Sequence, residues 1–258
     1  NLSAVVCREL GIQAPGLELG EWTSMVQRIK NRSNHVKIGL VGKYTELHDA
    51  YLSVAEALRH AGYCFNTHID IHWIDSEKID SNNRDQILSN LDGILVPGGF
   101  GSRGVEGMIL TAQYAREKKI PYFGICLGMQ VAVIEYARNV LGIPDANSGE
   151  FDEMTKHKVI DFMPGQSNDI DKGGTLRLGA YPCMIKSDTI LAKWYGTSSI
   201  RERHRHRYEL NNEYRKQLED AGMILGGISP DGRLVETIEL SSDQFYVGVQ
   251  FHPEFKSR

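Results

Sequence analysis

Pro121-Tyr-Phe-Gly-Ile-Cys-Leu-Gly-Met-Gln130 is the stretch that decides the fold. Its first half is a short apolar run of the kind found in buried strands, and residues 127–138 have the apolar spacing of a helix. The junction has the form Gly-x-Cys-x-Gly, which matches the nucleophile elbow, a tight turn that presents one side chain at the end of a parallel strand. Glycines flank Cys126 because the neighbouring chain crowds such a turn. The sequence therefore predicts a strand, an elbow and a helix, with Cys126 at the apex.

Apolar runs rich in β-branched residues alternate with helix-period segments on both sides of this stretch. The wholly apolar run at 94–96 is typical of a central strand that is buried on both faces. Further strands are expected at 36–41 and 64–74, and further helices at 49–60 and 105–118. This alternation predicts an α/β fold with a mostly parallel central sheet and flanking helices.

The two ends of the chain have a different pattern. Residues 151–178 are polar and turn-rich, and the later strands, which end on one at 245–251, are interrupted by a helix expected at 211–221. These features predict antiparallel strands added to the sheet. Residues 1–34 contain a Pro and Gly stretch followed by apolar residues at helical spacing. We interpret 1–34 as an inter-domain linker with one amphipathic helix packed on the main body, and 35–258 as one globular domain.

The composition restricts the class of protein. With 41% hydrophobic and 24% charged residues the chain is an ordinary globular mixture, and its net charge of −4 leaves no broad basic field for nucleic acid. Its apolar runs fall far short of the ~20 residues that span a membrane. The four cysteines form no CxxC pair, so neither a disulfide framework nor a structural zinc site is indicated. We therefore expect a soluble protein of a reducing compartment, the cytoplasm, with no membrane, nucleic-acid or metal partner.

Cys126 is the first candidate for chemistry. It would lie at the N-terminus of a helix, where unpaired backbone N–H groups and the helix dipole favour the thiolate, so the sulfur should be reactive if it is uncovered. The alternative is that Cys126 is a small apolar core residue, as many cysteines are.

A thiolate nucleophile needs a proton carrier, and Phe251-His-Pro-Glu254 supplies a candidate. On an extended segment His252 and Glu254 point to the same side, so the carboxylate can hold the imidazole in one tautomer and stabilise its charged form. Taken alone, such a sequence is usually a strand terminus with a solvated charge. Its weight comes from its coexistence with the cysteine elbow.

Pro97-Gly-Gly-Phe-Gly101 follows the strand at 94–96 and can aim backbone N–H groups at a ligand. Together with the N–H group of Leu127 it would form an oxyanion hole. The stretch Gly99-Phe-Gly-Ser-Arg-Gly104 also matches the dinucleotide fingerprint G-x-G-x-x-G. We reject that reading because the next strand ends in Cys126 and not in the acidic residue that a dinucleotide site requires.

Arg201-Glu-Arg-His-Arg-His-Arg-Tyr208 alternates charge and imidazole. If it is extended, Arg201, Arg203, Arg205 and Arg207 line one side while His204, His206 and Tyr208 line the other. The many guanidinium groups disfavour a metal cation and favour an anion. The alternative is an edge strand whose charges prevent edge pairing.

Three of these motifs, in this order, resemble the class I glutamine amidotransferases of the Cys-His-Glu type: Pro97-Gly-Gly-Phe-Gly, Gly124-Ile-Cys-Leu-Gly-Met-Gln130 and Gln250-Phe-His-Pro-Glu254. A narrower set resembles the branch of that family in which the domain follows an amidoligase domain that aminates UTP. This set comprises Gly42-Lys-Tyr, Gly101-Ser-Arg-Gly-Val-Glu-Gly-Met108, Met129-Gln, Arg177-Leu-Gly and His204-Arg-His-Arg-Tyr-Glu209. The resemblance covers about residues 35–256.

The resemblance implies a flavodoxin-like fold and a complete set of site residues. Cys126 would be the nucleophile, His252 the general base and acid, Glu254 its orienter, and the backbones of Gly98 and Leu127 the oxyanion donors. Substrate contacts would come from Gly99, Leu127, Gly128, Met129, Gln130, Glu150, Arg207 and Tyr208, with Glu150 meeting the ammonium of L-glutamine and Arg207 its carboxylate.

The resemblance also implies partners beyond this chain. The synthetase domain would bind ATP, Mg and UTP, and this chain contains no P-loop that would do so. The domain itself would need no cofactor, GTP would act as an activator at a site that the sequence does not locate, and the full-length protein would be a homo-oligomer.

Two other functions remain open from the sequence. The elbow could serve another γ-glutamyl hydrolase, or the domain could be a catalytically weak regulatory module that docks onto a synthetase.

Overall fold

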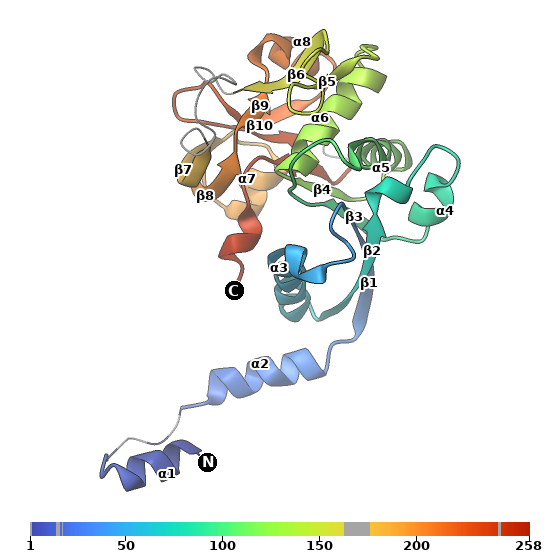
Figure 1. Ribbon diagram of the computed structural model, residues 1–258. Coiled ribbons are helices and arrows are strands. Elements are labelled where there is room, and N and C mark those ends of the chain that lie inside the picture. The colour runs from blue at the N-terminus through green and yellow to red at the C-terminus, as the bar shows by residue number, and fades with distance from the viewer. Residues whose placement is uncertain (1, 14–15, 17, 163–175, 242–243) are drawn as a thin grey trace.

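In the part of the chain that the structure describes, a nine-stranded sheet organises the main body (Figure 1). The computed structural model describes residues 2–13, 16, 18–162, 176–241 and 244–258. The strand order is β2-β1-β3-β4-β12-β11-β10-β7-β8. The five parallel strands are β2 (Thr67–Asp75), β1 (Asn34–Gly42), β3 (Gly93–Val96), β4 (Tyr122–Ile125) and β12 (Tyr246–Val249). Four antiparallel strands extend the sheet: β11 (Val235–Glu239), β10 (Ile224–Ile228), β7 (Arg177–Ile185) and β8 (Ser199–His206).

Helices cover both faces of this sheet, because successive strand residues point to opposite sides. Val41, Ile94 and Val96 pack against α5 (Val105–Lys118) and α6 (Leu127–Asn139). Leu40, Leu95 and Ile125 belong to the second core, with α3 (Leu52–Cys64) and α7 (Ile190–Tyr195). Smaller elements complete the body: α4 (Arg84–Leu88), α8 (Arg215–Asp220), and a three-stranded sheet of β5 (Ala146–Ser148), β6 (His157–Phe162) and β9 (Tyr208–Leu210). The predicted α/β class, with its parallel centre and added antiparallel strands, is confirmed.

Two element boundaries differ from the expectation. The second strand begins at Thr67 and not at residue 64, because α3 runs on through Gly62 to Cys64. Gly62 permits this because a Cβ atom there would lie 2.6 Å from the Thr67 carbonyl oxygen. The helix expected at 211–221 divides into a 3₁₀ turn at Asn212–Tyr214 and α8. Of the stretch expected to be turn-rich, 157–162 forms β6, and 163–175 lies outside the described residues.

The described residues of the N-terminal segment form two helices, α1 (Leu2–Glu9) and α2 (Gly20–Lys30). The helix expected around 21–30 is present and touches α3 of the main body, but its packing there is slight. None of its residues is buried, Trp22 is 65% exposed, and Figure 1 shows both helices standing away from the sheet. Helical periodicity identified an apolar stripe, and a stripe does not specify the surface that covers it. The boundary at residue 34 remains a prediction.

Candidate active site

The turn between β4 and α6 is a strained elbow with Cys126 at its apex. Cys126 has a φ of +52°, which a residue with a Cβ atom rarely adopts. A Cβ atom at Gly128 would lie 2.1 Å from the Val96 carbonyl oxygen, and one at Gly124 would lie 2.5 Å from the Gly128 carbonyl carbon. The flanking glycines are therefore required by contact with neighbouring backbone, as the sequence predicted. The Cys126 N–H group donates to the Val249 carbonyl oxygen at 2.7 Å, which joins the elbow to β12.

His252 and Glu254 come together just after β12. The His252 Nδ1 atom lies 2.8 Å from Glu254 Oε1, and the His252 N–H group donates to the Arg203 carbonyl oxygen at 2.7 Å. The segment is not extended, because Pro253–Lys256 forms a 3₁₀ turn that brings the carboxylate back to the ring. Burial opposes the imidazolium, but the proximity of Cys126, the hydrogen bond with Glu254 and the negative charges of both groups prevail and raise the pKa of His252 to about 10. Within the described chain, no hydrogen-bond partner of normal geometry is found for the Nε2 atom of this ring.

Gly98 lies between the sulfur-bearing residue and the ring. A Cβ atom there would lie 2.9 Å from His252 Cε1 and 3.6 Å from Cys126 Cβ, so the glycine backbone borders both side chains. Leu127 is the first residue of α6, and its N–H group has no acceptor within the helix. The two predicted oxyanion donors thus belong to residues on either side of Cys126.

Cys126 is less open than expected: the residue is only 4% exposed. It nevertheless lines two adjoining cavities, of about 240 and about 260 Å³. The larger also has His252, Glu254 and Gly98 in its wall, and the smaller has the recognition groups described next. The sulfur is therefore enclosed by the fold but borders space that a small substrate can occupy.

The smaller cavity gathers most of the predicted substrate contacts. Its lining consists of Gly99, Phe100, Cys126, Gln130, Glu150, Leu176, His206, Arg207 and Tyr208. Five of these were predicted as contacts, whereas Phe100, Leu176 and His206 were not. Gly128 and Met129, also predicted, do not line it: Gly128 packs on the Val96 backbone and Met129 is fully buried in the core. The Leu127 side chain is buried as well, which leaves its N–H group as the part that can reach a substrate.

The glycine-rich loop at 97–101 is held from two sides. The Lys43 ammonium donates to the Phe100 carbonyl oxygen at 3.0 Å and also to that of Gly101. Glu150 Oε1 accepts the Gly101 N–H at 2.7 Å. Burial lowers the pKa of Lys43 to about 8, against the influence of Glu150, and burial raises the pKa of Glu150. The motif Gly42-Lys-Tyr contained Lys43, but nothing local to it indicated a contact with a loop 57 residues away.

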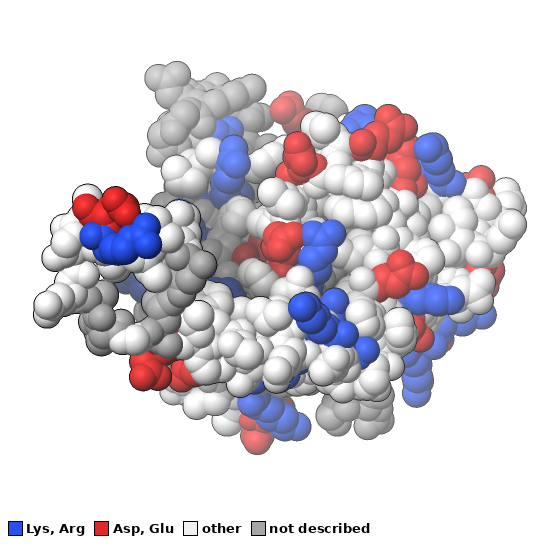
Figure 2. Space-filling model, turned by 90° about the horizontal axis from the view of Figure 1, so that it is seen from below, with Lys and Arg blue, Asp and Glu red and all other residues white. Residues whose placement is uncertain are grey.

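The arginine and histidine stretch forms β8 and alternates as predicted. Arg201, Arg203 and Arg205 are exposed, and Glu202, His204 and His206 are buried. The face of the molecule in Figure 2 shows Lys and Arg side chains interspersed with Asp and Glu. Of the four arginines, Arg207 lies beyond the strand end and lines the smaller cavity.

Behind this strand lies a buried polar network that the sequence did not reveal. Arg177 Nη1 lies 2.6 Å from Glu236 Oε1 and 3.6 Å from Glu209 Oε1. His204 Nδ1 lies 2.8 Å from His206 Nε2. Burial, reinforced by nearby positive charge, lowers the pKa of His204 to about 2 and that of His206 to about 3. Burial also raises the pKa of Glu236 to about 7 and that of Glu209 well above its usual range.

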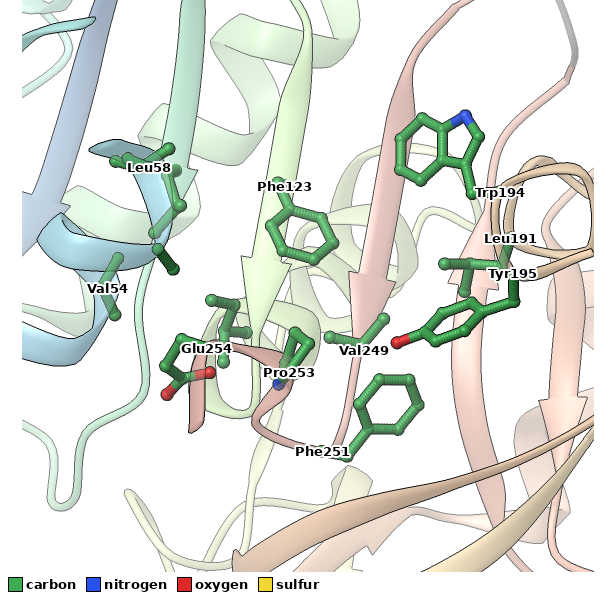
Figure 3. Close-up of a pocket in the computed structure, with 13 residues that line it drawn as sticks. Val54, Leu58, Phe123, Leu191, Trp194, Tyr195, Val249, Phe251, Pro253 and Glu254 are labelled. Carbon is green, nitrogen blue, oxygen red and sulfur yellow. The ribbon is translucent and has the colours of Figure 1, made fainter. Parts of the chain in front are cut away.

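A further cavity of about 360 Å³ lies on the α3 and α7 side of the sheet (Figure 3). Apolar side chains such as Phe123, Val249 and Trp194 surround it, and Glu254 stands at its edge. Its described lining is mainly apolar and offers no set of polar groups that would orient a substrate for the Cys126 sulfur.

No described helix is long and apolar enough to cross a bilayer. Among the residues that the structure places, no cluster of three or more His, Cys, Asp or Glu side chains is arranged to hold a metal. All four cysteines are free thiols.

Comparisons with known proteins show which family and which solved structures the chain resembles. The family model "Glutamine amidotransferase class-I" matches residues 46–258. CTP synthase from Listeria monocytogenes serotype 4b (strain F2365) is 57% identical over all 258 residues, which is 48% of that protein, and CTP synthase from Clostridium acetobutylicum is 56% identical over the same share. The chain therefore spans about half the length of the curated relatives it matches. The glutaminase domain of Trypanosoma brucei CTPS with bound acivicin is similar in structure, with a TM-score of 0.80, 42% identity, and coverage of 85% of this chain and 86% of that one.

Proposed function

This chain belongs to the class-I glutamine amidotransferase family, and we propose that it hydrolyses L-glutamine to glutamate and ammonia through a thioester on Cys126. One observation carries the proposal. The sulfur at the strained elbow borders both the cavity that His252 lines and the cavity that Glu150 and Arg207 line. Nucleophile, proton carrier and recognition groups therefore line two adjoining cavities that meet at Cys126.

Recognition uses the two charged ends of the amino acid. The Arg207 guanidinium binds the α-carboxylate, and the Glu150 carboxylate binds the α-ammonium, each in a charge-assisted pair. Glu150 can do this because Gly101 engages only its Oε1 atom. With the α-carbon held there, the side-chain amide extends toward Cys126 and the Gly98 and Leu127 backbone.

The first half of the reaction forms the thioester. The Cys126 thiolate attacks the amide carbon, and the Gly98 and Leu127 N–H groups stabilise the oxyanion. As the C–N bond breaks, the His252 imidazolium gives its Nε2 proton to the leaving nitrogen, and ammonia departs. Glu254 holds Nδ1 throughout, so Nε2 is the atom that faces the reaction.

The second half releases glutamate. Neutral His252 takes a proton from water, and the resulting hydroxide adds to the thioester carbonyl carbon. The C–S bond then breaks, the thiolate returns, and the imidazolium is restored beside it. No cofactor takes part in these steps.

We further propose that the ammonia serves a synthetase half of the same protein. The curated relatives are about twice as long and are named CTP synthase. In the whole protein, ammonia would pass to UTP activated by ATP and Mg, GTP would promote glutamine hydrolysis, and the protein would be a cytoplasmic homo-oligomer. Residues 1–34 would join the two halves.

The test is a glutaminase assay on the Cys126→Ala chain. We expect the substitution to abolish ammonia release without changing the melting temperature, because it removes the nucleophile and preserves the backbone. Cys64→Ala, at an exposed free thiol, is the matched control and should keep full turnover. Retained turnover in Cys126→Ala would refute the proposal.

Two further measurements separate the alternatives. A faster rate on γ-glutamyl peptides than on glutamine would favour another γ-glutamyl hydrolase. A glutamine-analogue electrophile that leaves no covalent adduct on Cys126, while the chain still binds a separately supplied synthetase half, would favour a docking module.

A further inference from the structure

Two buried glutamines connect the Cys126 sulfur to the strand that forms the substrate cavity. Gln130 Nε2 donates to the Tyr208 carbonyl oxygen at 3.0 Å and to Gln250 Oε1 at 3.2 Å. Gln250 Nε2 lies 3.5 Å from Cys126 Sγ. Gln130 is 3% exposed and Gln250 is not exposed at all, so bulk water has little access to these contacts.

The direction of this chain of hydrogen bonds is determined at one end. The Tyr208 carbonyl oxygen can only accept, so Gln130 must turn its NH₂ group toward it. The second hydrogen of that group then faces Gln250, which must therefore accept it with its side-chain oxygen, Oε1. An amide that turns its oxygen to Gln130 turns its NH₂ group to the opposite side, where Cys126 Sγ lies.

Backbone hydrogen bonds hold Gln250 in place and so restrict where its side chain can point. Its N–H group donates to the Glu236 carbonyl oxygen at 2.8 Å, which fixes the residue against β11. Gln250 follows directly on β12, and the Val249 carbonyl oxygen beside it accepts the Cys126 N–H at 2.7 Å. His206 Nδ1 also lies 3.3 Å from the Tyr208 carbonyl oxygen, which holds the far end of the chain.

We propose that Gln250 is a further catalytic residue, whose Nε2–H group donates a hydrogen bond to the Cys126 sulfur and stabilises the thiolate. The sulfur then has two neighbours from one segment, the Gln250 amide as a hydrogen-bond donor and the His252 ring as a nearby positive charge. The Tyr208 carbonyl, acting through Gln130, sets the direction of the amide donor. This role rests on the proposed function insofar as the Cys126 thiolate is the nucleophile.

Gln250→Glu tests the donor with the smallest change of shape. The carboxylate still accepts from Gln130 but cannot donate to the sulfur, and it adds a negative charge there. We expect alkylation of Cys126 by iodoacetamide, followed by peptide mass spectrometry, to slow at least ten-fold at neutral pH. The midpoint of the rate against pH should move up by about one unit or more, since one pH unit corresponds to a ten-fold change. The plateau rate at high pH should equal that of the unsubstituted chain.

Gln250→Met removes the donor without adding a charge. We expect the midpoint to move in the same direction by a smaller amount. A shift in Gln250→Glu alone would mean that the added charge causes it, and would overturn the hydrogen-bond role, as would unchanged profiles in both variants.

Gln244→Glu is the matched control, because Gln244 Nε2 donates to the Ala115 carbonyl oxygen at 2.8 Å, away from the sulfur. Its profile should match the unsubstituted chain, and an equal shift there would also overturn the proposal. Protection of the fully buried Cys183 from iodoacetamide, read in the same samples, verifies that each variant is folded. The assay uses no glutamine, so a chain that fails to hydrolyse glutamine can still support or refute the role of Gln250.

Discussion

Two groups of buried histidines in this molecule differ in charge: His252 is cationic, whereas His204 and His206 are neutral. His252 is 9% exposed, and His204 and His206 are each 2% exposed, so burial disfavours the imidazolium in all three. The pKa is nevertheless about 10 for His252, and about 2 and 3 for the other two. The comparison teaches that the partners of a buried ring, more than its depth, decide its charge.

The partners explain the difference. His252 lies between Glu254 and the Cys126 sulfur, two groups whose negative charge favours a cationic ring. The other pair lie against each other and near the Arg177 guanidinium, which disfavours a second cation. The cationic ring can donate a proton to a leaving group, whereas the neutral rings can join a chain of hydrogen bonds from His204 through His206 to the Tyr208 carbonyl oxygen.

Replacing His252, the cationic ring, should have the largest effect of the changes considered, and the effect should be on kcat. His252→Gln keeps a polar side chain but cannot carry the proton, and we expect kcat for glutamine hydrolysis to fall on the order of 10³-fold, as for loss of general acid–base catalysis. His72→Gln, at an exposed histidine that contacts Asp70, is the control and should leave kcat unchanged. Steady-state kinetics with ammonia detection provide the measurement. A loss of less than ten-fold would mean that His252 is not the proton carrier.

The second largest effect should come from Arg177→Met, which should destabilise the fold at the buried polar network beside His204 and His206. It leaves Glu236 and Glu209 buried side by side without their cation, and loss of one partner from such a site costs about 3 kcal/mol or more. Urea unfolding at pH 7.5 measures the change.

The control for this variant is Arg59→Met, which breaks an exposed pair with Glu56 and should cost less than about 1 kcal/mol. Equal losses in the two variants would show that the buried network does not depend on Arg177.

The smallest effect is on the pH dependence of stability. His204 and His206 have lowered pKa values, so below pH 6.5 the unfolded chain binds protons that the folded chain does not, and stability falls as pH falls. Glu236, with a pKa raised from 4.5 to about 7, acts in the opposite direction: between pH 7 and 4.5 the folded chain binds the extra proton. These contributions oppose each other between pH 6.5 and 4.5.

Glu236→Gln removes this opposition. We expect the free energy of unfolding to fall more steeply with acidification between pH 6.5 and 4.5, by about 1.4 kcal/mol for each pH unit. Urea unfolding at pH 7.5, 6.5, 5.5 and 4.5 would reveal it, with Glu213→Gln as an exposed control. Parallel curves for variant and unsubstituted chain would contradict the raised pKa of Glu236.

Local patterns predicted much of the fold. The strand, elbow and helix around Cys126 followed from apolar runs and two glycines, and the alternation of β8 followed from residue spacing. Both depend on neighbours within a few positions. The extent of the packing of α2 was not predicted, because periodicity does not identify a partner surface or the area that it covers.

The candidate site was predictable where its residues belong to short motifs. The sequence did not predict the role of Lys43 or the Arg177 network. Each contact joins segments 32 or more residues apart, and the local sequence of one segment does not indicate which other segment it contacts. Gln250 could have been found: it precedes His252 by two positions, the same spacing that directed attention from His252 to Glu254. The hydrogen bonds from Gln250 through Gln130 to the Tyr208 carbonyl oxygen join segments far apart in the sequence, so the spacing alone does not predict them.

The positive φ of Cys126 has a consequence for how knock-outs of this protein should be made. Alanine and serine each keep a Cβ atom, so they inherit the same backbone constraint as the native residue, and a comparison with them isolates the sulfur. Glycine alone would relax the turn, so a glycine variant would mix loss of the thiol with a release of conformational tension. The choice of replacement at Cys126 therefore decides whether an experiment reports on the loss of the thiol alone or also on the relief of backbone strain in the elbow.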